Sequence, residues 1–300
     1  MPDEHGGDGA RVARALGLDP ATILDLSASL NPVAPDVGPL LARHLDAVRS
    51  YPDPDQATQA LAVALGVDPD RVLLTNGGAE AIALVAADGG AGRVDDPEFS
   101  LYRRHLPTVA DRAPRWRSDP HNPTGRLAPA DEPGDVWDEA FYPLATGRWT
   151  SGRADQDPGF VVLGSLTKVF ACPGLRIGYV LADPDRIRRL ADRQPRWSVN
   201  GLAVAALPRM LETARLEAWA AEVARLRAAL VRVLRDHGLH PEPSDANYVL
   251  LPRAEGLRTA LAKHGVVVRD CASFGLAGHV RIAVPDDAGL ERVSGALEAW

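Results

Sequence analysis

Residues 165–179 read SLTKVFACPGLRIGY, and Lys168 stands near their centre. The chain has 33 basic residues, but only Lys168 and Lys263 are lysines and the others are arginines. A lysine that persists in so arginine-rich a chain is a candidate for a role that a guanidinium group cannot fill. The main role of this kind is a Schiff base, because a primary amine condenses with an aldehyde and arginine does not.

The residues around Lys168 fit such a role. Residues 161–163 form a short apolar run typical of a buried strand, and small and hydroxyl residues follow it. Ser165 and Arg176 are both suited to bind a phosphate, Arg176 through a charge-assisted fork. On spacing alone, an ordinary turn with one exposed lysine explains the stretch equally well. Lys263 lies near the expected C-terminal end of a helix, where a cation suits the helix dipole.

The composition limits the class of protein. With 300 residues, 46% of them apolar, the chain can bury a sizeable core in one or two domains. Its net charge of -7 argues against nucleic acid or an anionic membrane as the main partner. Cys172 and Cys271 match neither a disulfide framework nor zinc spacing, and no signal peptide is seen, which favours the cytoplasm. No apolar stretch approaches membrane-spanning length, and the eight histidines show no metal-ligand spacing, so no metal site is expected.

Apolar runs alternate with amphipathic segments, which is typical of an α/β protein. Strands are expected at residues 71–75, 136–141, 161–163, 179–181, 247–251 and 279–284. A long helix is expected to begin at Leu216 and to end at Gly238. Its core-facing stripe recurs every three or four residues and consists of Leu216, Trp219, Val223, Leu226, Leu230 and Leu234.

Three further motifs are suited to bind or orient a ligand. Residues 76–80 read NGGAE between an expected strand and helix, where backbone N–H groups and the helix dipole can bind an anion. An ordinary strand–helix connection has the same sequence character. Residues 122–125 read NPTG, which is a turn cluster. Asp138 is expected at the C-terminal end of a strand.

These motifs and the lysine stretch occur in an order that resembles the fold-type I pyridoxal phosphate (PLP) enzymes, within the class I and II aminotransferases. The resemblance covers nearly the whole chain. It implies a large domain with a mostly parallel central sheet and a small C-terminal α/β domain. The expected division is an N-terminal arm at 1–35, a large PLP-binding domain at 36–205 and a small domain at 206–300.

The resemblance also implies roles in cofactor binding. Lys168 would be the catalytic residue that carries PLP through a Schiff base. Asp138 would pair with the pyridinium nitrogen and keep the ring able to accept electrons. Asn122 would bind the phenolic oxygen of the ring. The cofactor phosphate would be held by Gly78, Ala79, Ser165, Thr167 and Arg176.

Other roles concern the ring face, the partner subunit and the substrate. Tyr102 resembles the aromatic residue that stacks on the ring. Tyr51 resembles the tyrosine that reaches the phosphate from the other subunit of a homodimer. Arg281 resembles the arginine that binds the substrate α-carboxylate. Asn247 lies in the matching substrate-binding stretch.

Four shorter matches are more specific. HGG at 5–7, LDLSASLNP at 24–32, DEAF at 138–141 and RDCASF at 269–274 resemble the L-threonine-O-3-phosphate decarboxylases of cobalamin synthesis, which are close to the histidinol-phosphate aminotransferases. Phe141 stands where many of the aminotransferases carry a tyrosine. In the decarboxylase interpretation, the residues near the substrate phosphate would be His5, Ser27 and Asn31.

The chain departs from the family in the middle of the large domain. Tyr102 and Asn122 are only 20 residues apart, and Asn122 and Asp138 only 16. The family normally has longer segments here, with at least a strand and a helix. We therefore expect a trimmed large domain that lacks part of its sheet.

The resemblance and the short middle segment leave three functions open. The first is PLP-dependent decarboxylation of L-threonine O-3-phosphate, a small phosphorylated amino acid. The second is aminotransfer of the histidinol-phosphate type. The third is a non-catalytic PLP-fold binding protein, which the short middle segment would suit. The two reactions share nearly all their site residues and differ in which Cα bond of the substrate stands perpendicular to the cofactor ring.

Overall fold

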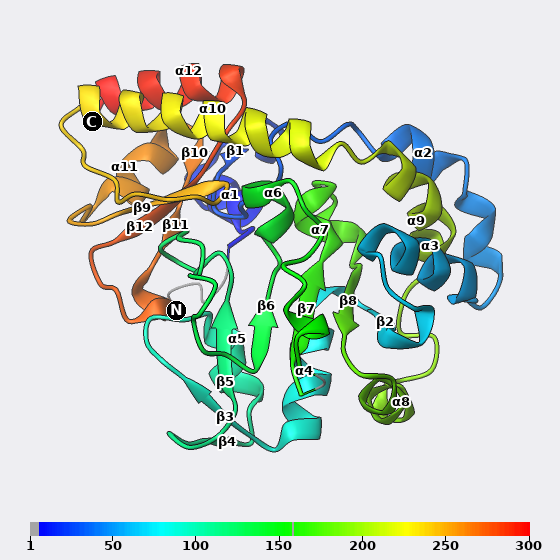
Figure 1. Cartoon of the computed structure of the whole chain (residues 1–300). Helices are drawn as coiled ribbons and strands as arrows, with labels where there is room; N and C mark the ends of the chain where they lie inside the picture. Colours follow the sequence, from blue (N-terminus) through cyan, green and yellow to red (C-terminus); the bar gives the residue numbers. More distant parts are fainter. Residues whose placement is uncertain (1–5, 158) are drawn as a thin grey trace.

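The computed structural model describes residues 6–157 and 159–300. A seven-stranded sheet of order β2-β8-β7-β6-β5-β3-β4 forms its centre (Figure 1). The strands are β2 Val72–Thr75, β3 Ala91–Val94, β4 Thr108–Val109, β5 Arg115–Ser118, β6 Val136–Asp138, β7 Val161–Ser165 and β8 Gly178–Leu181. Only β8 runs antiparallel to its neighbours. The expected α/β class with a mostly parallel sheet is confirmed.

Helices cover both faces of this sheet. One face packs against α4 Gly77–Gly89, α5 Ser100–His105 and α8 Pro184–Arg193, whose apolar side chains share a core with Val94, Val161 and Val180. The other face packs against α3 Asp55–Leu65 and α9 Gly201–Thr213. Shorter helices are α2 Gly38–Ala42, α6 Tyr142–Thr146 and α7 Leu166–Val169. Single 3-10 turns lie at Pro20–Thr22, Leu45–Arg49, Pro69–Arg71, Arg153–Asp155, Pro173–Leu175 and Ala272–Phe274.

The shortened middle segment keeps its strands and has short connections. Contrary to our expectation that part of the sheet is missing, residues 103–137 contain β4, β5 and most of β6. Five residues, 110–114, join β4 to β5 although these strands lie on opposite sides of β3. In the described chain, no helix lies between β5 and β6. The large domain is therefore trimmed in its crossovers.

The small domain contains a three-stranded antiparallel sheet of order β11-β12-β9, covered by helices (Figure 1). Its elements are α10 Leu216–Asp236, β9 Tyr248–Leu251, α11 Leu257–Lys263, β10 Val266–Val267, β11 Arg269–Asp270, β12 Val280–Ala283 and α12 Asp287–Glu298. All six residues of the predicted α10 stripe are buried, which confirms the helix and its packing face. No helix in the described ranges is long and apolar enough to cross a membrane.

The N-terminal segment joins the small domain to the lysine turn. It contains α1 Gly9–Leu16 and β1 Leu24–Asp25, and β1 pairs in parallel with β10. Asp8 forms an ion pair of 2.6 Å with Arg258 of α11. At the other end, the Asn31 N–H donates to the carbonyl of Lys168 at 3.0 Å. Residues 24–31 therefore contact both domains beside Lys168.

Candidate active site

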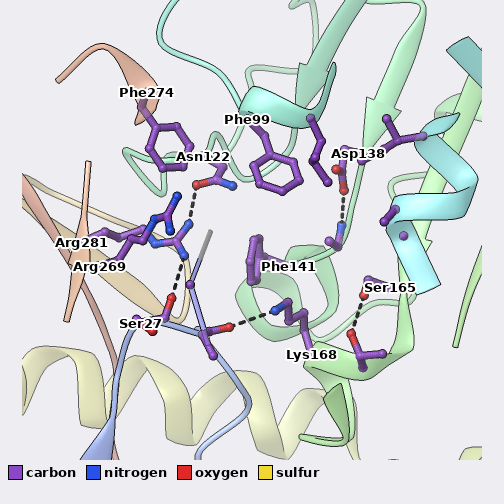
Figure 2. Close-up of a pocket in the computed structure, with 18 of the residues that line it drawn as sticks. Ser27, Phe99, Asn122, Asp138, Phe141, Ser165, Lys168, Arg269, Phe274 and Arg281 are labelled. Carbon is purple, nitrogen blue, oxygen red and sulfur yellow. Dashed lines mark hydrogen bonds between the residues drawn. The ribbon is translucent and has the colours of Figure 1, made fainter. Parts of the chain in front are cut away.

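A pocket of about 300 Å³ lies where the C-terminal ends of β5, β6 and β7 meet the start of α4 and the small-domain sheet (Figure 2). This is the edge at which open α/β sheets bind their ligands. The predicted site residues that line it are Ser27, Gly78, Ala79, Asn122, Asp138, Ser165, Thr167, Lys168, Arg176 and Arg281. The fold thus brings together residues that lie more than 250 positions apart.

Lys168 extends into the pocket from the short helix α7, directly after β7. Its Nζ donates a hydrogen bond of 3.0 Å to the carbonyl of Ala28. Burial lowers the pKa of Lys168 to about 8, and the positive charges of Arg281 and Arg176 add to this effect. A lysine with a lowered pKa is partly neutral near physiological pH and can act as a nucleophile.

Asp138 ends β6 and offers its carboxylate to the pocket. Its Oδ2 accepts a hydrogen bond of 2.8 Å from the Tyr102 hydroxyl, and its Oδ1 accepts one of 3.0 Å from the Ala140 N–H. Burial raises the pKa of Asp138, while these two donors and the charge of Lys168 oppose the rise. Donors at both oxygens favour the ionised form, which can pair with a protonated ring nitrogen.

An anion cradle lies at the start of α4. Gly78 and Ala79, in the first turn of this 13-residue helix, line the pocket together with Ser165, Thr167 and Arg176. The hydroxyls of Ser165 and Thr167 lie 2.8 Å apart. Backbone N–H groups, the helix dipole, two hydroxyls and a guanidinium group converge here, which is a suitable arrangement for a phosphate.

Glycines make this cradle possible. Gly77 has a φ of +75°, and a Cβ on it would lie 2.3 Å from Nη2 of Arg176. A Cβ on Gly178 would lie 2.9 Å from the backbone nitrogen of Gly78. Only glycine at both positions lets the helix start, the strand β8 and Arg176 approach so closely. The cradle, Lys168 and Asp138 together fit the phosphate, aldehyde and ring nitrogen of PLP.

Two arginines form the wall opposite the cradle. Arg269 on β11 and Arg281 on β12 are direct partners in the antiparallel pair, so their side chains lie on the same face. Arg281 donates a hydrogen bond of 2.5 Å to Oδ1 of Asn122 and one of 3.4 Å to the carbonyl of Ser27. Burial lowers the pKa of both guanidinium groups, that of Arg269 to about 10. Two buried like charges side by side make this wall suitable for anionic substrate groups.

Tyr102 does not line the pocket, and its predicted stacking role is corrected. Its side chain is fully buried, with its ring centroid 5.7 Å from that of Phe99 and 5.5 Å from that of Trp116, and its hydroxyl is occupied by Asp138. Three residues earlier, Phe99 lines the pocket and points into it (Figure 2). Phe99 is therefore the aromatic candidate for the cofactor ring.

Asn31 and Asn247 also lie outside the pocket lining, contrary to their predicted contact with substrate. Asn31 Nδ2 donates a hydrogen bond of 2.9 Å to the carbonyl of Val169. Asn247 Nδ2 donates one of 2.8 Å to the carbonyl of Ser29. Both amides bind backbone, because each lies where the N-terminal segment crosses a domain. They support the pocket wall from behind.

Two further predicted residues lie elsewhere. Tyr51 is 76% exposed and stacks on Trp197 with ring centroids 4.3 Å apart, away from this subunit's own pocket. Its contact with the pocket of a second subunit stays a prediction. His5 lies outside the described residues.

Nine pocket-lining residues were not predicted from the sequence, and four of these carry an aromatic ring or a charge. The four are Phe99, Phe141, Arg269 and Phe274. Phe141, Arg269 and Phe274 lie within the quoted stretches 138–141 and 269–274, but no spacing rule separates them from core residues. The signal for Arg269 is its register with Arg281, which requires knowledge of the strand pairing.

A buried lysine, an acid for a ring nitrogen and a phosphate cradle in one pocket define a PLP-dependent enzyme. The sequence model for aminotransferases of class I and II matches residues 118–297. The chain therefore belongs to the class I and II aminotransferase family, and its cofactor is pyridoxal phosphate.

Known relatives cover nearly the whole chain. The threonine-phosphate decarboxylase of Salmonella typhimurium is 32% identical, over 98% of this chain and 95% of the relative. The histidinol-phosphate aminotransferase of Symbiobacterium thermophilum is 30% identical, over 96% and 92%. Among solved structures, the L-threonine-O-3-phosphate decarboxylase of Porphyromonas gingivalis has a TM-score of 0.80 at 24% identity, covering 91% of this chain and 98% of that one. The histidinol-phosphate aminotransferase of Sinorhizobium meliloti with bound PLP has a TM-score of 0.83 at 21% identity, covering 96% and 92%. The expected fold-type I architecture is confirmed.

Proposed function

We propose that the enzyme decarboxylates L-threonine O-3-phosphate. The observation that carries this proposal is the pair of guanidinium groups, Arg269 and Arg281, on one wall of the Lys168 pocket. The substrate has two anionic groups, a carboxylate on Cα and a phosphate on the side chain. Arg281 would bind the carboxylate and Arg269 the phosphate, each as a fork. The similarity to the Salmonella decarboxylase supports this assignment.

The residues of the pocket divide the chemistry between them. Bound PLP supplies an electron sink for the bond that breaks at Cα. The cradle and Asp138 would hold the cofactor's two ends. Phe99, Phe141 and Phe274 line the same pocket (Figure 2) and would exclude water from the reacting carbon. Arg281 orients the carboxylate that leaves as CO2. Lys168 Nζ then delivers the proton that Cα requires, which a pKa of about 8 allows near neutral pH.

Aminotransfer of the histidinol-phosphate type is the second candidate. The similarity to the Symbiobacterium aminotransferase favours it. The same pocket would serve, with Lys168 taking a proton from Cα instead of donating one. Histidinol phosphate has no carboxylate, so Arg281 would then bind a carboxylate of the second substrate, 2-oxoglutarate or glutamate.

The decisive experiment measures CO2 release from L-threonine O-3-phosphate by the PLP-loaded protein, with Lys168→Ala as the control. We expect release that depends on Lys168. Bound PLP without CO2 release would overturn the proposal. In that case, transfer of the amino group from histidinol phosphate to 2-oxoglutarate would be measured with the same two proteins.

The proposed assembly is a homodimer. Tyr51 and its stacking partner Trp197 are exposed, and other exposed apolar side chains lie in the same part of the chain, namely Leu45, Val48 and Val63. A second copy would cover them and bring Tyr51 to its partner's pocket. The proposed domains are an arm at 1–35, a large domain at 36–205 and a small domain at 206–300. Helix α9 crosses the boundary between the large and small domains and packs on α3.

A further inference from the structure

A buried glutamate outside the pocket is connected to two of its lining residues. Glu98 lies in the loop between β3 and α5, with 5% of its surface exposed. Its carboxylate accepts four hydrogen bonds: 2.6 Å from the Ser118 hydroxyl, 3.0 Å from the Ser118 N–H, 3.2 Å from Arg117 and 3.3 Å from the Phe99 N–H. Such a set of donors is needed to offset the cost of burying the group.

The contacts continue from Glu98 to the cofactor pocket. When Glu98 is ionised its carboxylate accepts only, so the Ser118 hydroxyl then directs its proton to Glu98. The free lone pairs of Ser118 Oγ then accept the N–H of Asn122, at 2.8 Å. Asn122 lines the pocket, and so does Phe99, whose own N–H reaches Glu98. One carboxylate therefore holds the backbone of two pocket residues that come from different loops.

We propose that Glu98 is a positioning residue for the cofactor ring, which acts through Ser118 on Asn122 and through the backbone on Phe99. Fixing the Asn122 backbone fixes where its side-chain amide points. The Oδ1 atom of Asn122 accepts from Arg281, so its Nδ2 is the atom left to donate to the cofactor. This role concerns the cofactor and does not depend on the substrate of the proposed reaction.

Several charged and titratable groups face Glu98. Arg117 is the cation in contact with it. His121 Nε2 lies 3.8 Å away, but burial lowers the pKa of His121 to about 4, and its Nε2–H donates to a backbone carbonyl, so the ring is neutral. The phenols of Tyr102 and Tyr248 are also within range of its charge. Burial raises the pKa of Glu98 to about 7. A buried carboxylate whose pKa is raised in spite of Arg117 is sensitive to the loss of any one donor.

The test uses a property of the bound cofactor that a purely structural glutamate would not change. A donor at the phenolic oxygen stabilises negative charge there and favours loss of the proton from the Lys168 nitrogen linked to the cofactor. Weakening the Asn122 donor therefore raises the pH midpoint at which the visible absorbance of the PLP-loaded protein changes. This midpoint is measured without any substrate, so it is independent of the decarboxylation experiment.

Four PLP-loaded variants would be titrated beside the unaltered protein: Glu98→Gln, Asn122→Ala, the double variant and Glu139→Gln. Glu139 is the matched control, because it is also a buried glutamate bound to a serine, Ser151, with its pKa raised to about 7, and it does not line the pocket. We expect Glu98→Gln to raise the midpoint by about 0.5–1 pH unit and to weaken PLP binding about 3–10-fold, as for the loss of one hydrogen bond to a charged group.

The double variant tests whether Glu98 changes the pH midpoint through Asn122. If Glu98 acts through Asn122, then Glu98→Gln changes the midpoint little once Asn122 is alanine, because the two changes share one path. Equal shifts in both backgrounds, no shift at all, or the same shift in Glu139→Gln would overturn the proposal. If Glu98→Gln does not fold, Ser118→Ala replaces it, and an unchanged midpoint in that variant would overturn the proposal equally.

Discussion

Nη1 of Arg281 donates a hydrogen bond of 2.5 Å to Oδ1 of Asn122, 159 positions earlier in the chain. This bond joins the small-domain sheet to the turn beyond β5, and so joins the expected substrate site to the expected cofactor site. The guanidinium group lies 4.7 Å above the Tyr248 ring, which leaves its forked edge for Asn122, Ser27 and an incoming anion. If Arg281 binds the substrate as proposed, substrate binding would act directly on Asn122, which lines the cofactor pocket.

Replacing the two wall arginines one at a time should separate the two anionic groups of the substrate. Lysine keeps the charge but loses the fork, so we expect kcat/KM for L-threonine O-3-phosphate to fall about 10–100-fold in either variant. Arg269→Lys should weaken inhibition by O-phosphoethanolamine, which lacks the carboxylate, more than Arg281→Lys does. Inhibition constants for this compound measure the difference. An equal effect of both variants would contradict the assignment of one anion to each arginine.

Lys168 should reduce the stability of the PLP-free protein. Its pKa falls from 10.5 to about 8 on folding, so the folded state disfavours the proton that the unfolded state binds. This penalty is complete below pH 8 and disappears as the pH rises to 10.5. Lys168→Met should therefore raise the free energy of unfolding at pH 7 by about 1–3 kcal/mol, and by less at pH 10. Urea unfolding at both pH values measures this.

The chain offers a matched control in its other lysine. Lys263 is exposed at the end of α11, so Lys263→Met should change the free energy of unfolding by less than about 0.5 kcal/mol at either pH. A gain in Lys168→Met that is the same at pH 7 and pH 10 would mean that better packing, and not the charge, is responsible.

A buried ion pair, Arg153–Asp119, contacts the helix-free connection between β5 and β6. Arg153 donates a hydrogen bond of 2.5 Å to Asp119 and another to the carbonyl of Pro129. Asp119 also accepts a hydrogen bond from the N–H of Ala128. Arg153→Met would leave a buried carboxylate unpaired and should lower the free energy of unfolding by about 3 kcal/mol. Urea unfolding measures the loss.

An exposed ion pair provides the comparison for that variant. Arg209 and Glu212 pair on the surface of α9, with 65% and 57% of their side chains exposed. Arg209→Met should cost less than about 0.5 kcal/mol. If both arginine variants lose the same stability, the Arg153 pair is not what fixes the connection.

The sequence predicted best what local pattern and chemistry determine. The run at 161–163 and the lysine after it identified β7 and the centre of the site, and the spacing of apolar residues from Leu216 identified α10 and its buried face. The alternation of apolar runs and amphipathic segments predicted the α/β fold. The family resemblance carried by the order of the four motifs implied that they meet in one pocket. The first three inferences need only neighbours along the chain.

What the sequence did not reveal depends on register and on contacts between distant segments. Tyr102 and Phe99 lie within one helical turn, and only the start of α5 decides which ring faces the pocket. Arg269 becomes a candidate only when β11 is known to pair with Arg281 on β12. Asn31 and Asn247 bind backbone because the N-terminal segment crosses both domains, and no local pattern predicts that crossing.

Tyr51 should act in the pocket of the partner subunit. If Tyr51 acts in the pocket of the other subunit, then in a mixed dimer Tyr51→Ala and Lys168→Ala both damage the same site, that of the subunit without Lys168. The subunit that keeps Lys168 would receive an intact Tyr51 from its partner, and one complete site would form. Co-refolding the two inactive variants should therefore restore activity, up to about a quarter of the unaltered enzyme for random mixing of subunits. If Tyr51 acts within its own subunit, neither site in the mixed dimer is complete, and mixing should restore nothing. Mixing each variant with an equal amount of the Lys168→Ala, Tyr51→Ala double variant is the control, because no such dimer has a complete site in either case.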